Sequence, residues 1–121
     1  MNDALNEAVR AATTEICQTV LGKHVTSGPA TVAKAESRHY ETSVVISFVG
    51  SISGAFALRC SMKVGAAIAS QMLGTQIAEA SDDMKDAVGE FFNMIVGAAK
   101  TRVIKDVEWE RVPQDKVAAD G

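Results

Sequence analysis

The fold of this 121-residue chain is decided by residues 42–60, which read TSVVISFVGSISGAFALRC. Residues 42–49 are short and rich in β-branched side chains, which is typical of a buried strand. Residues 55–60 alternate larger apolar side chains with small or charged ones, as a second strand does. The connection at 50–54 holds two glycines that can take a positive φ. The stretch therefore predicts an antiparallel β-hairpin.

Helices are predicted on both sides of this hairpin. Apolar residues recur at helical spacing over about residues 3–21, 61–73 and 82–104. Residues that favour helix ends bound these segments, namely Asn2, Asp3, Ser61 and Ser81 at the starts and Gly22 and Gly74 after the ends. The longest helix also has acidic residues in its first turn and basic residues near its last, as the helix macrodipole favours.

Two further strands are predicted outside the hairpin. Residues 30–39 are a candidate first strand with an unfavourable Ala and Lys content, and residues 107–112 alternate like an edge strand. The order α-β-β-β-α-α-β predicts an α+β two-layer domain, in which an antiparallel sheet packs against two or three helices. No linker or repeat divides the chain, so we expect a single domain over residues 1–121, frayed at 113–121.

The composition argues against several classes of protein. Twelve Lys and Arg against fifteen Asp and Glu give a net charge of −3, which disfavours nucleic-acid binding. No apolar run approaches the ~20 residues of a bilayer span, and no secretory signal is visible. Two cysteines and two histidines are too few for a disulfide framework or a zinc site. We therefore expect a cytoplasmic protein without a metal site, membrane insertion or a nucleic-acid partner.

The helix predicted at 82–104 has two faces of different chemistry. One is an apolar stripe that we assign to the core, made of Met84, Ala87, Val88, Phe91, Met94, Ile95 and Ala98. Another face carries Asp86, Glu90, Asn93 and Gly97, at spacings of four, three and four residues.

Several residues of this helix are unfavourable for helix formation. Asp86 and Glu90 are like charges one turn apart, and the Asn93 amide competes for backbone hydrogen bonds. Gly89 and Gly97 each cost about 1 kcal/mol relative to alanine. Such choices gathered on one helix often mark a functional surface. A solvated face with small residues for close helix packing is the alternative.

Three parts of the chain resemble the CheX branch of the CheC/CheX/FliY chemotaxis phosphatases. They are residues 48–60, residues 66–74 with their Met72-Leu73-Gly74 ending, and residues 86–97. The resemblance covers about residues 3–105 and agrees with the predicted order of elements. Its sharpest match is the family's helix motif, an acid or Ser, three residues, Glu, two residues and Asn. Here the motif is Asp86, Glu90 and Asn93, followed by Met94-Ile95 and Gly97.

This resemblance implies hydrolysis of the aspartyl phosphate on a CheY-type response regulator. Asn93 would orient the attacking water, since an amide offers a donor and an acceptor at once. Glu90 would pair with the regulator's active-site lysine, and Asp86 would have a helping role. Gly89 and Gly97 would permit close approach of the regulator, or else pack against a neighbouring helix. The protein would need no cofactor of its own, because the Mg²⁺ would belong to the regulator.

The resemblance also bears on assembly. The nearest second candidate motif, at residues 15–18, has Gln in place of Asn, so we count one site. One motif is similar to CheX rather than to CheC, and CheX-type proteins are expected to form homodimers. Family members continue with a proline-marked turn and further strands. Pro113 matches that proline, but residues 114–121 hold little that favours strands. Either another subunit closes the sheet edge, or the shortened domain is catalytically weakened.

Two other functions are left open by the sequence. The first is a non-catalytic module that binds a regulator or assembles a chemotaxis or two-component complex through the same helix or a sheet edge. The second is a small-molecule hydrolase, which the sequence disfavours because it lacks a base–nucleophile pair. Ser51, Ser53 and Ser61 are better explained as turn and cap residues.

Overall fold

The computed structural model describes residues 3–28, 41–49, 53–103 and 108–112. In chain order the elements are α1 (Asp3–Ile16), the single-turn π-helix η1 (Cys17–Leu21), β1 (Thr42–Val49), β2 (Gly54–Cys60), α2 (Met62–Leu73), α3 (Asp82–Val103) and β3 (Glu108–Val112). The predicted hairpin, three helices and last strand are therefore present, and the first predicted helix ends in a π turn. The predicted strand at 30–39 and the tail at 113–121 lie outside the described residues.

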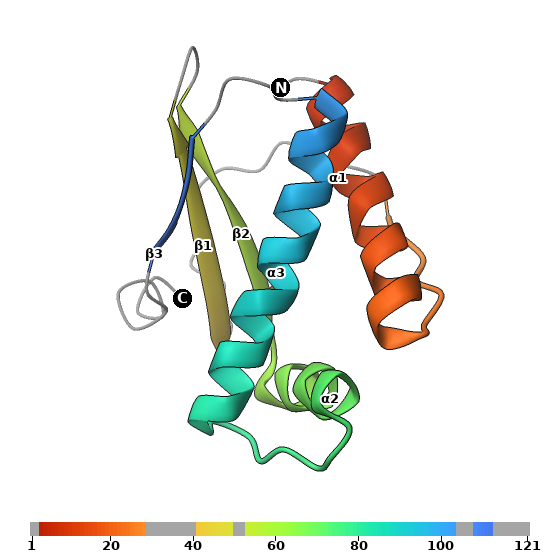
Figure 1. Cartoon of the computed structure of the whole chain (residues 1–121), viewed down its shortest axis with the longest axis vertical. Coiled ribbons are helices and arrows are strands. Elements are labelled where there is room, and N and C mark those ends of the chain that lie inside the picture. Colours follow the sequence, from red (N-terminus) through yellow and green to blue (C-terminus); the bar gives the residue numbers. More distant parts are fainter. Residues whose placement is uncertain (1–2, 29–40, 50–52, 104–107, 113–121) are drawn as a thin grey trace.

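The described strands form a three-stranded antiparallel sheet in the order β2-β1-β3 (Figure 1). β1 is central, as its burial requires, and pairs with β2 from Thr42 opposite Cys60 to Phe48 opposite Gly54. On its other side β1 pairs with β3, so the last strand lies at an edge of the described sheet, as predicted.

Alternate side chains of the hairpin face the helices. Val44, Ile46 and Phe48 are buried in the core, and the Phe48 ring centroid lies 5.1 Å from that of Phe56. Gly54 stands opposite Phe48, where a Cβ atom would lie 2.7 Å from the tip of the ring. Glycine at this position therefore lets the phenylalanine ring fill the core.

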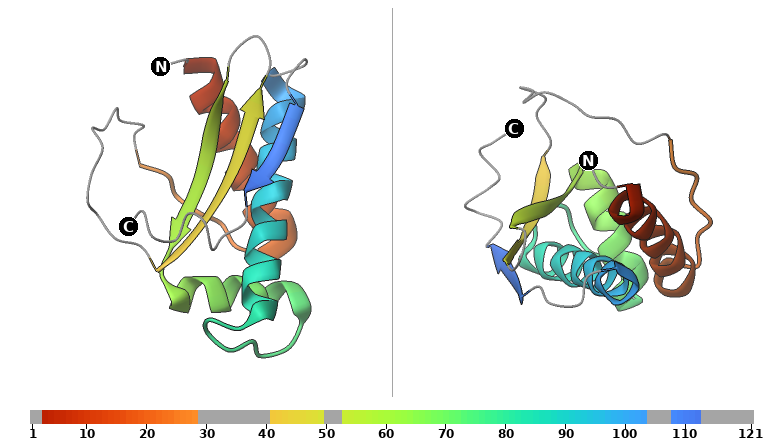
Figure 2. Two further views of the ribbon diagram at one scale, coloured as in Figure 1. Left: turned by 90° about the vertical axis from the view of Figure 1, so that its left-hand side faces the viewer. Right: turned by 90° about the horizontal axis from the view of Figure 1, so that it is seen from above.

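The helices form a second layer with α3 at its centre. Figures 1 and 2 show α1 running antiparallel beside α3, and α2 crossing near the N-terminal end of α3. The buried core joins small residues of α1, such as Ala8 and Ala12, to large ones of α3, such as Met84 and Phe91. The chain is thus an α+β fold in which one helix contacts both other helices and the sheet.

The helix ends predicted at Ser61, Ser81, Gly22 and Gly74 are present, whereas Asn2 lies outside the described residues and Asp3 is the first residue of α1. The hydroxyls of Ser61 and Ser81 each accept a hydrogen bond at 3.1 Å, from the backbone N–H groups of Val64 and Met84. Gly22 and Gly74 end their helices with φ values of 65° and 71°. These positive values are the reason for glycine at both ends.

In the part of the chain that the structure describes, no helix is long and apolar enough to cross a membrane.

Candidate functional site

The buried side of α3 is wider than its sequence predicts. Besides most of the predicted stripe, the structure also buries Gly89, Phe92, Val96 and Ala99. The cause is that α1, α2 and β1 contact this helix from different sides. A helix held on several sides is a rigid support for whatever its remaining face presents.

The remaining face of α3 carries the residues that the motif singled out. Asp86, Glu90 and Gly97 are exposed, and Asn93 is partly buried. With 3.6 residues per turn, their spacing sets them in one row along the helix, opposite the centre of its buried side. The row runs from an acidic end at Asp86, through the amide, to the bare backbone of Gly97.

The polar side chains of this row are not engaged within the molecule. Among the described residues, Asp86, Glu90 and Asn93 make neither a hydrogen bond through their side chains nor an ion pair. Beyond the row, by contrast, Arg102 of α3 donates a 2.5 Å hydrogen bond to Glu15 of α1. A partly buried amide usually has a partner, so an unused one is available to a ligand or a water molecule.

The two glycines singled out in this helix have different surroundings. Gly89 is buried. Gly97 is exposed, and among the described residues no atom outside the neighbouring helix backbone lies within 4 Å of where its Cβ would stand. Sequence spacing alone left close packing and partner approach open for both.

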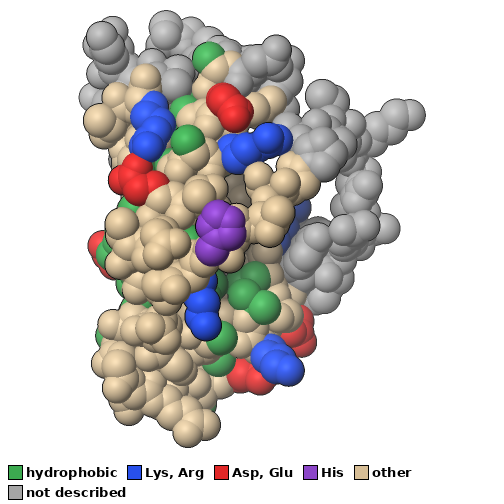
Figure 3. All heavy atoms as spheres, turned by 90° about the vertical axis from the view of Figure 1, so that its right-hand side faces the viewer, with side chains coloured by type: hydrophobic (Ala, Val, Ile, Leu, Met, Phe, Trp, Pro, Cys, Tyr) green, Lys and Arg blue, Asp and Glu red, His purple; other side chains and the backbone are tan. Residues whose placement is uncertain are grey.

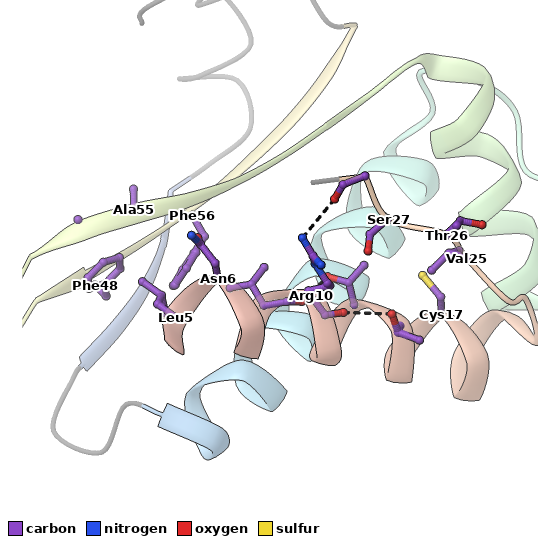
Figure 4. A pocket seen from close by; sticks show the side chains of 15 residues that line it. Leu5, Asn6, Arg10, Cys17, Val25, Thr26, Ser27, Phe48, Ala55 and Phe56 are labelled. Carbon is purple, nitrogen blue, oxygen red and sulfur yellow. Dashed lines mark hydrogen bonds between the residues drawn. The ribbon is translucent and has the colours of Figure 1, made fainter. Parts of the chain in front are cut away.

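A separate pocket of about 590 Å³ lies between α1, residues 25–28 and the hairpin. Figure 4 shows Leu5 and Phe48 near one end, Cys17 and Val25 near the other, and Asn6 and Arg10 between them. Arg10 donates a 3.3 Å hydrogen bond across the opening to the carbonyl of Gly28. Viewed from the side of α1, the surface is hollowed, and its charged side chains are scattered (Figure 3).

Sequence reasoning missed this pocket. Asn6 and Arg10 lie in the helix predicted over about residues 3–21 and were not singled out there, whereas the structure uses both in the pocket wall. No local pattern marks the pocket, because it depends on how far α1 stands from the strands. Burial raises the pKa of the Cys17 thiol in the same wall, which lowers the fraction of reactive thiolate.

The row on α3 and the pocket suit different ligands. None of Asp86, Glu90, Asn93 or Gly97 lines the pocket; they lie on the outer side of a helix. Small molecules generally bind in concave sites, whereas a helix face suits the surface of another protein. Among the described residues, no group of three His, Cys, Asp or Glu side chains is arranged to hold a metal ion.

Comparisons with known proteins show the family of the chain and its fold. Residues 42–113, more than half of the chain, match the family model described as chemotaxis phosphatase CheX. This match includes the hairpin, α2, the whole of α3 and β3. No curated protein matches the chain.

Several solved structures share the fold. A CheC-like superfamily protein from Shewanella sp. PV-4 is 20% identical, with a TM-score of 0.82 over 94% of this chain and 79% of that one. The chemotaxis protein CheX from Vibrio vulnificus is 21% identical, with a TM-score of 0.80 over 89% and 75%.

A third similar structure contains a partner. It is the CheX–CheY–BeF₃–Mg²⁺ complex from Borrelia burgdorferi, 17% identical, with a TM-score of 0.62 over 90% of this chain and 73% of that one. At 17–21% sequence identity, the similarity to these three structures shows only a shared fold. The family is shown by the sequence match over residues 42–113. The chain belongs to the CheX family of chemotaxis phosphatases.

Proposed function

We propose that this protein hydrolyses the aspartyl phosphate of a CheY-type response regulator. The observation that carries the proposal is the row of polar side chains on α3, which are exposed or partly exposed and have no partner among the described residues. Membership of a phosphatase family and the CheY partner of the Borrelia CheX support the same function.

The chemistry needs little from this chain beyond placement of groups. An acyl phosphate is already reactive, so catalysis consists mainly of positioning a water molecule in line with phosphorus and stabilising charge. The Asn93 amide accepts a hydrogen bond from that water and donates one to a phosphoryl oxygen, which fixes the line of attack. The regulator would hold the Mg²⁺, which would supply positive charge beside the phosphoryl group when bound.

The two carboxylates recognise the regulator. Glu90, one turn before Asn93, forms an ion pair with the regulator's active-site lysine and so aligns the two surfaces. Asp86, one turn further, adds negative potential at the same end of the row and speeds encounter with a basic surface. Because α3 is packed on three sides, binding there needs no rearrangement of the helix.

The proposal is tested by the rate at which a phosphorylated regulator loses its phosphate. Wild type should accelerate this loss, and Asn93→Ala should remove at least about 100-fold of the acceleration, as for other deleted transition-state hydrogen bonds. Glu90→Ala should mainly raise KM, because it weakens docking. Gln71→Ala removes an exposed amide from α2 and serves as the matched control.

Two results would count against this mechanism. Full activity of Asn93→Ala would overturn the assignment of the water-positioning group. Tight binding of the regulator by wild type without faster loss of phosphate would instead identify a non-catalytic binding module that uses the same face of α3.

A further inference from the structure

Almost every glycine in the described helices, strands and caps has a reason within the molecule. Gly22 and Gly74 have positive φ values, and Gly54 makes room for the Phe48 ring. Gly65 faces α3, where a Cβ would lie 3.2 Å from the sulfur of Met84. Gly89 is buried.

Gly97 has no comparable reason. It lies in the interior of α3, its φ is in the ordinary range, and it is exposed. Among the described residues a Cβ there would meet nothing within 4 Å. Apart from proline, glycine is the least favourable residue inside a helix, so the isolated chain would be more stable with alanine at this position.

The place of Gly97 connects it to the site. It follows Asn93 by four residues, so the two lie one above the other on the same side of α3, about 6 Å apart along the axis. The Gly97 carbonyl also accepts a 3.0 Å hydrogen bond from the Thr101 hydroxyl, which keeps that side chain against the helix. One turn beyond Asn93, therefore, no side chain projects from position 97 and the helix backbone is exposed.

We infer that Gly97 is a positioning residue, which lets the response regulator lie directly against the backbone of α3 one turn beyond Asn93. This inference rests on the proposed function and extends the regulator's footprint toward the C-terminal half of α3. A methyl group at position 97 would hold the regulator off by about 1–1.5 Å and tilt it away from Asn93. A displacement of about 1 Å at a reacting centre costs on the order of 100-fold in rate.

The test compares stability and activity in the same variants. Gly97→Ala should raise Tm by about 4 °C. It should also slow regulator dephosphorylation by about 10- to 100-fold. Gly97→Leu should slow it further while the helix stays intact. Titration with regulator activated by beryllium fluoride should give a raised Kd for both variants, since the larger side chains obstruct docking.

Ala80→Gly is the matched control. Ala80 has a φ of 61°, which strains any residue but glycine, and it precedes α3. This substitution should also raise Tm, because it relieves strain, yet it adds nothing to the row on α3. If Ala80→Gly keeps its activity, a higher Tm does not by itself slow the protein. The loss of activity in Gly97→Ala would then be due to the lost space at position 97.

The outcomes distinguish this inference from the proposed function. If wild type is active and Gly97→Ala is equally active, the clearance role is wrong and the phosphatase function stands. A fall in Tm for Gly97→Ala would also overturn the inference, because it would reveal an internal role for glycine. If wild type binds the regulator without hydrolysis, the function fails, and the Kd of Gly97→Ala still decides the role of Gly97. Absence of binding by wild type would overturn both.

Discussion

The double variant Asp86→Ala/Asn93→Ala tests whether the row on α3 is kept for a partner rather than for the fold. Neither side chain has a partner among the described residues, so no internal hydrogen bond or ion pair is lost. Alanine is the better helix former at both positions. The change also removes the like-charge pair that Asp86 forms with Glu90 one turn away. The structure therefore predicts a protein that is more stable and less active.

The size of the effect follows from helix propensities. Asp and Asn are each about 0.6 kcal/mol less favourable than Ala in a helix, and relief of the charge pair adds about 0.3 kcal/mol. The free energy of unfolding should thus rise by about 1.5 kcal/mol. A chain of 121 residues gains about 4 °C in Tm for each kcal/mol, so Tm should rise by about 6 °C.

This shift in Tm is measured by thermal unfolding followed by circular dichroism. Ser81→Ala serves as a control that should lower Tm instead of raising it. That variant removes the 3.1 Å hydrogen bond to the Met84 N–H at the start of the same helix and should cost about 1 kcal/mol. If the double variant is less stable than wild type, Asp86 or Asn93 supports the fold. The argument that their unfavourable chemistry serves a partner would then be refuted.

Two further predictions concern the core and the thiols. Met84→Ala should lower the free energy of unfolding by about 2–5 kcal/mol in a denaturant titration, because this side chain is fully buried between α2 and α3; a loss below 1 kcal/mol would contradict the packing described. Burial raises the pKa of both Cys17 and Cys60, so alkylation at mildly alkaline pH should be slower in the folded than in the unfolded protein. As pH rises, the unfolded chain loses the thiol protons before the folded protein does. The contribution of the thiols to the free energy of unfolding is therefore complete below their ordinary pKa and declines as pH rises above it. This decline should be missing in a double variant with serine at both positions.

Local chemistry was enough to predict the hairpin and the starts and ends of most of the described helices. The β-branched residues of the segment 42–49 favour a strand over a helix. The connection to the next strand is short, so the two strands pair as an antiparallel hairpin. Ser61 and Ser81 satisfy backbone N–H groups that a helix start leaves open, and Gly22 and Gly74 adopt the backbone that ends one. These interactions lie within a few residues of each other, so a sequence displays them directly.

The row on α3 was also visible in the sequence, because helical periodicity fixes which residues share a side. The same periodicity could not tell how much of the helix is covered. Phe92 and Val96 lie beside the predicted stripe and are buried because neighbouring elements close around them. How many helices and strands pack around α3 depends on the tertiary structure and cannot be read from the helical spacing of its apolar residues.

Residue order alone was therefore sufficient to predict the hairpin, most helix ends and the shared side of Asp86, Glu90 and Asn93. Gly89 and Gly97 were told apart only by the packed molecule, which buries the first and leaves the second exposed. It alone also brought Arg10 to the carbonyl of Gly28 and opened the pocket behind them. The physical reason is that burial and close approach depend on contacts between segments far apart in the chain, which local spacing does not encode.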